Sequence, residues 1–270
     1  MIRRITLILL FLVGTASMTM AYNNTYAIIV GVADYKNFHG IGDGDLNYTV
    51  SDAINFASFL KSKKGGSVPA TNIVLLTNAQ ASKGNIIAKG KALFAKAKKD
   101  DRVIFYFSGH GAKGCFLPYD FSTMGDNLLY FSEVKSIFKA AKCDTKLLFA
   151  DACFAGSMKN NISANKALMK SIKKGHKSAD NMNIVVMMSC QDDETSIESS
   201  AWGNGLFTYY LMEGLGGKAN RDGNKFVTIQ ELYYYVYHKV QDRAAQCRPP
   251  HKQTPELFGK FDLRLIVAKV

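Results

Sequence analysis

A histidine and a cysteine, each beside a glycine and each preceded by an apolar run, are the residues of this chain best suited to covalent chemistry. His110 lies in the segment SGHG and Cys153 in the segment DACFAG. The runs before them, RVIFYF (102–107) and KLLFA (146–150), have the composition of buried strands. Because parallel strands of an α/β sheet end at one edge, we expect the two residues to meet there. A thiol beside a proton-transfer partner is the pair that a cysteine protease needs.

The rest of the chain alternates between strand and helix patterns. Further strands are predicted at 26–32, 72–77 and 183–189, and helices at about 49–62, 82–99, 128–142, 205–215 and 228–246. Strands that alternate with helices form a mainly parallel sheet with helices on both faces. The predicted fold class is therefore α/β, a three-layer α/β/α sandwich. Residues 157–183 are rich in lysine, lack a strand pattern and are expected to form an exposed connector.

The first residues have the features of a secretory signal peptide. Arg3 and Arg4 precede the apolar run ITLILLFLV, and the small residue Ala21 offers a cleavage site. The run is shorter than the roughly 20 residues that span a bilayer. We therefore expect residues 1–21 to be removed, leaving a mature domain at 22–270 with no membrane span and a secreted or periplasmic location. The alternative is an uncleaved N-terminal anchor.

Charge and cysteine content narrow the classes of partner and site. The formal net charge is +12 over 270 residues, carried by lysines spread along the chain. No arginine cluster or nucleic-acid motif accompanies it, so a solvated surface is expected and no nucleic-acid partner. The 5 cysteines are an odd number for an exported protein, so at least one is expected to be unpaired within the chain. No pair has CxxC spacing, which gives a zinc site little support.

Five segments together resemble bacterial caspase-like and metacaspase-like cysteine proteases, and they occur in that family's order. They are SGHG, DACFAG, SCQDDETSIE at 189–198, GNGLFTYYLMEGL at 203–215 and QTP at 253–255. The resemblance implies a caspase-like sheet and endopeptidase activity on peptide or protein substrates. A gingipain- or clostripain-like protease of the same fold is an alternative. A catalytically silent caspase-like binding module is another, although retention of both His110 and Cys153 speaks against it.

In an enzyme of this kind, Cys153 would attack the scissile carbonyl as a thiolate and form an acyl-enzyme. His110 would transfer protons, above all to the departing amine. The backbone N–H groups of Gly111 and Cys153 would hold the developing oxyanion.

The resemblance also implies cleavage after arginine or lysine. Caspases that cut after aspartate carry glutamine two residues before the nucleophile and arginine after it, whereas this chain has Asp151 and Phe154 there. An acid in that pocket would attract a cationic side chain and repel an anionic one. By the same resemblance, Asp52 and Ser108 would line the pocket. For Asp52 the alternative is an ordinary charge near a helix N-terminus.

No metal or cofactor is expected. Many metacaspases depend on calcium bound by an acidic insertion after the catalytic histidine, but here only AKGCF separates GHG from LPYD, which leaves Asp120. The segment NRDGNKFVTIQE (220–231) resembles a calcium loop, yet Lys225 stands where glycine is needed. The acidic run at 192–194 is expected to be a solvated loop.

The lysine-rich connector is a candidate for self-cleavage. Caspase-like chains often carry a processing segment between the nucleophile strand and the next strand, and exposed backbone is accessible to a protease. The candidate sites are Lys159, Lys166, Lys170, Lys173, Lys174 and Lys177.

Overall fold

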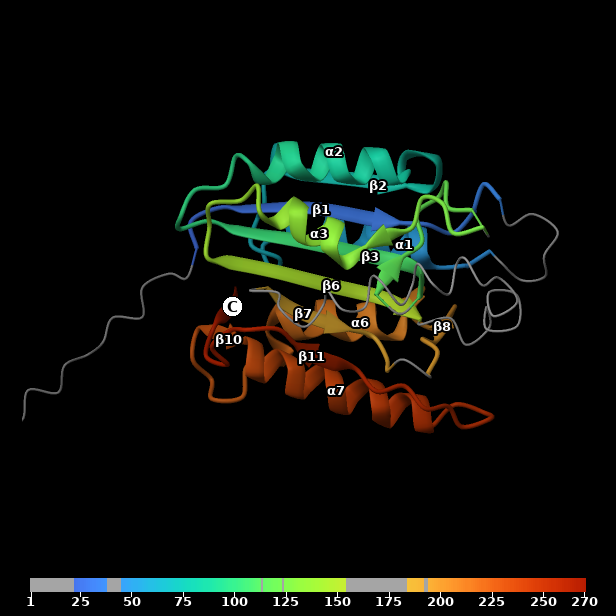
Figure 1. Ribbon diagram of the computed structural model, residues 1–270. Helices are drawn as coiled ribbons and strands as arrows, with labels where there is room; N and C mark the ends of the chain where they lie inside the picture. The colour runs from blue at the N-terminus through green and yellow to red at the C-terminus, as the bar shows by residue number, and fades with distance from the viewer. Residues whose placement is uncertain (1–21, 38–44, 113, 123, 154–183, 192–193) are drawn as a thin grey trace, which may run out of the picture.

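A computed structural model describes residues 22–37, 45–112, 114–122, 124–153, 184–191 and 194–270. The central sheet is built from β1 (Thr25–Gly31), β2 (Ile73–Thr77), β3 (Arg102–Ala112), β6 (Thr145–Cys153), β7 (Val185–Met188) and β11 (Glu256–Phe258). Their order across the sheet is β2, β1, β3, β6, β7, β11 (Figure 1). The strands pair in parallel except β11, which runs antiparallel to β7.

Helices and short strands surround this sheet. The helices are α1 (Thr49–Lys61), α2 (Lys83–Phe94), α3 (Phe131–Phe138), α6 (Leu206–Glu213) and α7 (Ile229–Ala245). Short helical segments occur at η1 (Ala70–Asn72), η2 (Asn78–Gln80) and η3 (Gly214–Lys218). The short strands pair as β4 (Cys115–Phe116) with β5 (Leu129–Tyr130), β8 (Glu198–Ser199) with β9 (Asn204–Gly205), and β10 (Phe226–Thr228) with β12 (Ile266–Lys269).

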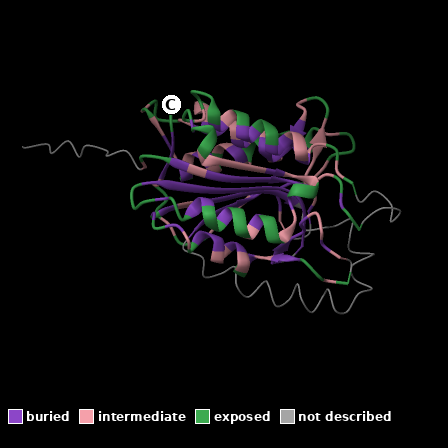
Figure 2. Cartoon of the chain, turned by 90° about the horizontal axis from the view of Figure 1, so that it is seen from above, coloured by how far each residue is buried: buried purple, intermediate pink, exposed green. Residues whose placement is uncertain are grey.

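Alternating side chains of the strands fill two apolar cores, one on each face of the sheet. In β3, Val103, Phe105 and Phe107 pack in the core that contains α2 and α3. Ile104 and Tyr106 pack in the core that contains α1, α6 and α7. The sheet is accordingly buried on both faces, while the helices expose their outer sides (Figure 2). The predicted three-layer α/β/α sandwich with a mainly parallel sheet is confirmed.

The chain departs from the sequence prediction at several boundaries. The strands expected at 102–107 and 146–150 are longer than predicted: β3 continues to Ala112 and β6 to Cys153, and the two strands keep pairing through SGHG and DAC. The helix expected from residue 128 begins at Phe131, since Leu129 and Tyr130 pair with β4. Strand β11 was missed because three residues are too few to show a period of two.

Two expectations concern residues outside those that the structure describes: the signal peptide at 1–21 and the whole connector at 157–183, including its lysines. Among the described residues, no helix is both long and apolar enough to cross a membrane. Cys115, Cys143 and Cys247 are free cysteines, which agrees with the expected presence of an unpaired cysteine.

Candidate active site

Strands β3 and β6 place the two predicted catalytic residues side by side. Their parallel register pairs Ser108 with Asp151 and His110 with Cys153. Neighbouring strands in a sheet lie about 4.8 Å apart, so the backbones at positions 110 and 153 are adjacent. The pairing that the sequence predicted at the carboxyl edge of the sheet is therefore present in the backbone.

Tyr35 fixes the histidine segment from the loop after β1. His110 is 4% exposed, and its backbone N–H donates to the Tyr35 hydroxyl over 2.7 Å. The two rings lie 5.2 Å apart, centroid to centroid. A Cβ atom at position 109 would come within 2.8 Å of the Tyr35 hydroxyl oxygen, so Gly109 is needed for this approach. Gly111, the predicted oxyanion donor, follows in β3 and pairs with Phe116 of β4.

A cavity of about 230 Å³ lies beside this segment, in the α1 and α6 layer. It is lined by Leu46, Asn47, Tyr48, Thr49, Asp52, Ser108, Gly109, Asp151, Ser196 and Glu198. Three of these residues carry carboxyl groups, and none of the described lining residues is a lysine or arginine. All three pocket residues that the sequence predicted, Asp52, Ser108 and Asp151, thus lie together.

Asp52 reaches the pocket from the first turn of α1 and is 1% exposed. Its carboxyl oxygens accept from the Ser108 hydroxyl and from the backbone N–H of Gly205, each over 2.8 Å. Burial raises the pKa of Asp52 well above its usual range, and the negative charge of Asp151 raises it further. Among the described residues the acid is held by neutral donors only, and it is buried, so it is not an ordinary solvated charge at a helix N-terminus.

Asp151 enters the pocket from β6, opposite Asp52. It accepts from the Ser196 hydroxyl over 2.6 Å and from the Thr208 hydroxyl and backbone N–H over 2.8 and 3.1 Å. Burial raises its pKa as well. A Cβ atom at position 205 would stand 2.3 Å from the Asp151 carboxylate, so only glycine fits between the two acids. This contact explains the second glycine of the GNGLF segment.

Glu198 of β8 is a pocket acid that the sequence analysis did not single out. Its carboxylate accepts from the backbone N–H groups of Asn47 and Tyr48 over 3.2 and 3.3 Å, at the start of α1. Burial raises the pKa of Glu198, and the charge of Asp151 adds to the increase. The only signal in the sequence was its place at the end of SCQDDETSIE.

Comparison with known proteins identifies the fold that holds this site. Residues 24–264 match the family model described as caspase domain. The chain belongs to the caspase-domain family of peptidases. A probable protease from a Desulfuromonadales bacterium is 27% identical over 87% of this chain, which spans about a third (32%) of that relative's length.

Two solved structures share the caspase-domain fold. Caspase-1 from Spodoptera frugiperda superposes with a TM-score of 0.60 at 17% identity, covering 88% of each chain. A protein of Geobacter sulfurreducens gives a TM-score of 0.59 at 17% identity, over 90% of this chain and 97% of the other. At this level of identity the likeness concerns the fold.

Gln253, in the QTP segment of this caspase domain, supports the pocket from behind. It is 1% exposed, and its amide nitrogen donates to the Ser196 hydroxyl over 2.9 Å and to the Ser189 carbonyl over 3.1 Å. Its amide oxygen accepts from the backbone N–H of Ile197 over 3.0 Å. Because Ser196 in turn donates to Asp151, Gln253 fixes the donor that orients this carboxylate.

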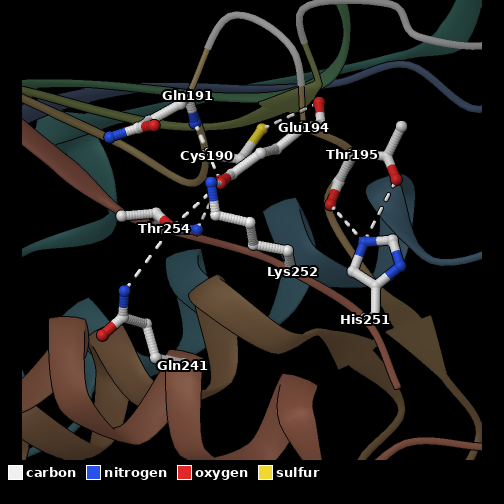
Figure 3. Close-up of polar contacts among 8 residues, drawn as sticks. All are labelled: Cys190, Gln191, Glu194, Thr195, Gln241, His251, Lys252 and Thr254. Carbon is white, nitrogen blue, oxygen red and sulfur yellow. Dashed lines mark hydrogen bonds and ion pairs between the residues drawn. The ribbon is translucent and has the colours of Figure 1, made fainter.

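Glu194 holds the residues on both sides of Gln253 in the chain, Lys252 and Thr254 (Figure 3). Its buried carboxylate accepts from the Thr254 hydroxyl over 2.9 Å and pairs with the Lys252 ammonium over 3.0 Å. Burial alone would raise the pKa of Glu194, but hydrogen bonds from Lys252 and Thr254 hold it below the usual value. The expectation of a solvated acidic loop is therefore wrong at Glu194, because its buried carboxylate connects its own loop to the loop of Lys252 and Thr254. Positions 192 and 193 lie outside the described residues.

Proposed function

We propose that this protein is a secreted or periplasmic cysteine endopeptidase that cleaves after arginine or lysine. Cys153 is its nucleophile and His110 its proton-transfer partner. The caspase-domain match, the protease name of the relative and the pairing of positions 110 and 153 support the proposal. Export is proposed from the signal-like sequence at 1–21 alone.

The catalytic cycle divides one difficult hydrolysis into two steps. The Cys153 thiolate adds to the scissile carbonyl carbon, and the electron pair of the C=O bond moves to the oxygen. Backbone N–H groups of Gly111 and Cys153 stabilise this oxyanion. When the intermediate collapses, the C–N bond breaks and His110 delivers a proton to the amine. Water then hydrolyses the thioester, with His110 accepting a proton from it.

The proposed specificity for arginine or lysine rests on the carboxyl groups that line the pocket. Ser108 and Asp151 stand two residues before His110 and Cys153 on the paired strands, so the pocket adjoins the bond to be cut. A guanidinium group offers five N–H donors and an ammonium group three, which suits a pocket of carboxylates. An aspartate side chain would meet like charge there.

Matched fluorogenic peptides that end in arginine, lysine or aspartate test the proposal. We expect the wild type to hydrolyse the arginine and lysine peptides, and Cys153→Ala to hydrolyse none. Asp151→Asn is expected to lower kcat/KM for the arginine peptide by about 10- to 100-fold, the scale of a lost charge-assisted hydrogen bond. The control is Asp126→Asn, which changes an exposed aspartate outside the pocket.

Two results would overturn parts of this proposal. A preference for the aspartate peptide would contradict the pocket assignment while leaving the nucleophile intact. Absence of turnover together with no labelling of Cys153 by a peptide acyloxymethyl ketone would point instead to a catalytically silent binding module.

A further inference from the structure

A second and larger cavity lies at the opposite edge of the sheet. Its volume is about 340 Å³. It shares no lining residue with the pocket of Asp52, Asp151 and Glu198, here called the carboxylate pocket. It adjoins the amino ends of β1 and β3, near β10 and the C-terminus (Figure 1). Strand β3 thus begins at this cavity with Arg102 and reaches the candidate active site at His110.

The described walls of this cavity are mainly apolar, with some polar groups such as Asn24 and Ser67, and the charged groups among them are all cations. Phe59 and Leu60 of α1, Leu215 of η3 and Phe226 of β10 are among the apolar lining residues. The charged lining residues are Arg102, Lys64 and Lys269, of which both lysines are exposed. No aspartate or glutamate is among the described residues that line it.

Arg102 is buried here without an acidic partner among the described residues. It is 3% exposed, and its Nε and Nη2 donate to the Thr25 hydroxyl over 3.2 and 2.9 Å. Nη1 donates to the backbone carbonyl of Val267, and the ring of Tyr22 lies 3.8 Å from the guanidinium carbon. These bonds use three of the five N–H donors of the guanidinium and leave two for another acceptor.

The charge on Arg102 persists despite its burial. Burial lowers the pKa of the guanidinium, but its ordinary value lies so far above neutrality that the group stays a cation. A buried cation whose hydrogen-bond partners are neutral lacks the counter-charge that ordinarily offsets its desolvation. An anion is therefore the complementary group for this site.

We propose that this cavity binds a carboxylate carried on an unbranched apolar chain, a ligand of the medium-chain fatty acid type. The carboxylate accepts hydrogen bonds from Arg102, and the lysines at the mouth attract it from solution. The apolar chain lies against the walls that α1 and η3 provide. The volume is at the lower end of the range for small-molecule pockets, roughly 300 to 1,000 Å³, which suits a chain of medium length.

Titration calorimetry with decanoate and 1-decanol, both kept below their aggregation limits, tests this proposal. The two probes share the apolar chain and differ in the charged head group. We expect saturable binding of decanoate at one site, at least tenfold tighter than decanol, as charge-assisted hydrogen bonds would give. In Arg102→Met the preference for decanoate should disappear while decanol binding remains. The matched control is Lys99→Met, which removes an exposed cation close in sequence to β3 but outside the cavity.

A second variant covers the case in which Arg102→Met does not fold. Lys64→Met combined with Lys269→Met should weaken decanoate binding several-fold and leave decanol binding unchanged. Equal affinity of the wild type for both probes, or a preference for decanoate that survives in Arg102→Met, would overturn the proposal. Because binding is measured without turnover, the result is independent of the proposed peptidase activity.

Discussion

Replacement of Asp52 by asparagine is expected to stabilise the free protein at neutral pH and at the same time to weaken hydrolysis after arginine. Asparagine can keep the local hydrogen bonds, because its amide oxygen can accept from the Gly205 N–H and its amide nitrogen can donate to the Ser108 hydroxyl. What changes is the charge, which in the wild type is buried close to Asp151.

The sign of the stability change follows from the raised pKa of Asp52. The folded protein binds the Asp52 proton more tightly than the unfolded chain does, so the free energy of unfolding falls as pH rises from the ordinary value of 3.8 to the raised pKa. Above that window the loss is complete. At a pH above that window, removing the charge should restore on the order of 1 kcal/mol, within the range of single stabilising substitutions. For a domain of this size that corresponds to an increase in Tm of about 2 to 4 °C.

Thermal unfolding between pH 4 and 8, combined with hydrolysis of the arginine peptide, measures both effects. Asp52→Asn should flatten the decrease in Tm with pH and lower kcat/KM by roughly 10- to 100-fold. Asp126→Asn, at an exposed site, should change neither quantity. A variant that unfolds at a lower temperature at pH 7 yet hydrolyses the arginine peptide like the wild type would refute the reasoning, because Asp52 would then serve structure alone.

Three further outcomes are expected. His110→Ala should lower kcat by about a hundredfold or more, the usual scale for lost acid–base catalysis, with a circular dichroism spectrum like that of the wild type. Intact-mass spectra should show cleavage after a lysine of the 157–183 connector in the wild type and none in Cys153→Ala; fragments in both proteins, or in neither, would contradict self-cleavage. Gln253→Leu should raise KM for the arginine peptide about tenfold by releasing Ser196, and a lower kcat with unchanged KM would contradict this positioning role.

Sequence patterns predicted the parts of the fold that rest on local periodicity. The runs before His110 and Cys153 are apolar enough to mark buried strands, and parallel pairing of such strands brings their ends together. Helices α1 and α7 were predicted to within a residue or so of each end for the same reason. The short ribbons were missed, because two- or three-residue strands owe their position to tertiary contacts rather than to a sequence pattern.

The pocket could be predicted only as far as the resemblance reached. Asp52, Ser108 and Asp151 were expected through motifs that other proteins share. Contacts such as Asp52 with Gly205, which are 153 residues apart, follow no periodicity and depend on how loops cross the edge of the sheet. Glu198 enters on the short strand β8, and apart from its place at the end of SCQDDETSIE nothing in the sequence distinguishes it from a surface acid.

Two neighbouring acids of this sheet edge indicate why a cation from outside the chain would suit the carboxylate pocket, as proposed above. Glu194 is buried, yet it is paired with Lys252, and its pKa is lowered as expected for a carboxylate that secures structure. Asp52 is buried to a similar degree, its donors within the described part of the chain are all neutral, and its pKa is raised. Neutral donors orient a carboxylate without offsetting its charge, so the free pocket is less stable than an internal ion pair would make it. A guanidinium or ammonium group of a substrate would supply the missing positive charge. The attraction between that cation and the pocket carboxylates would then contribute to substrate binding rather than to the stability of the free fold.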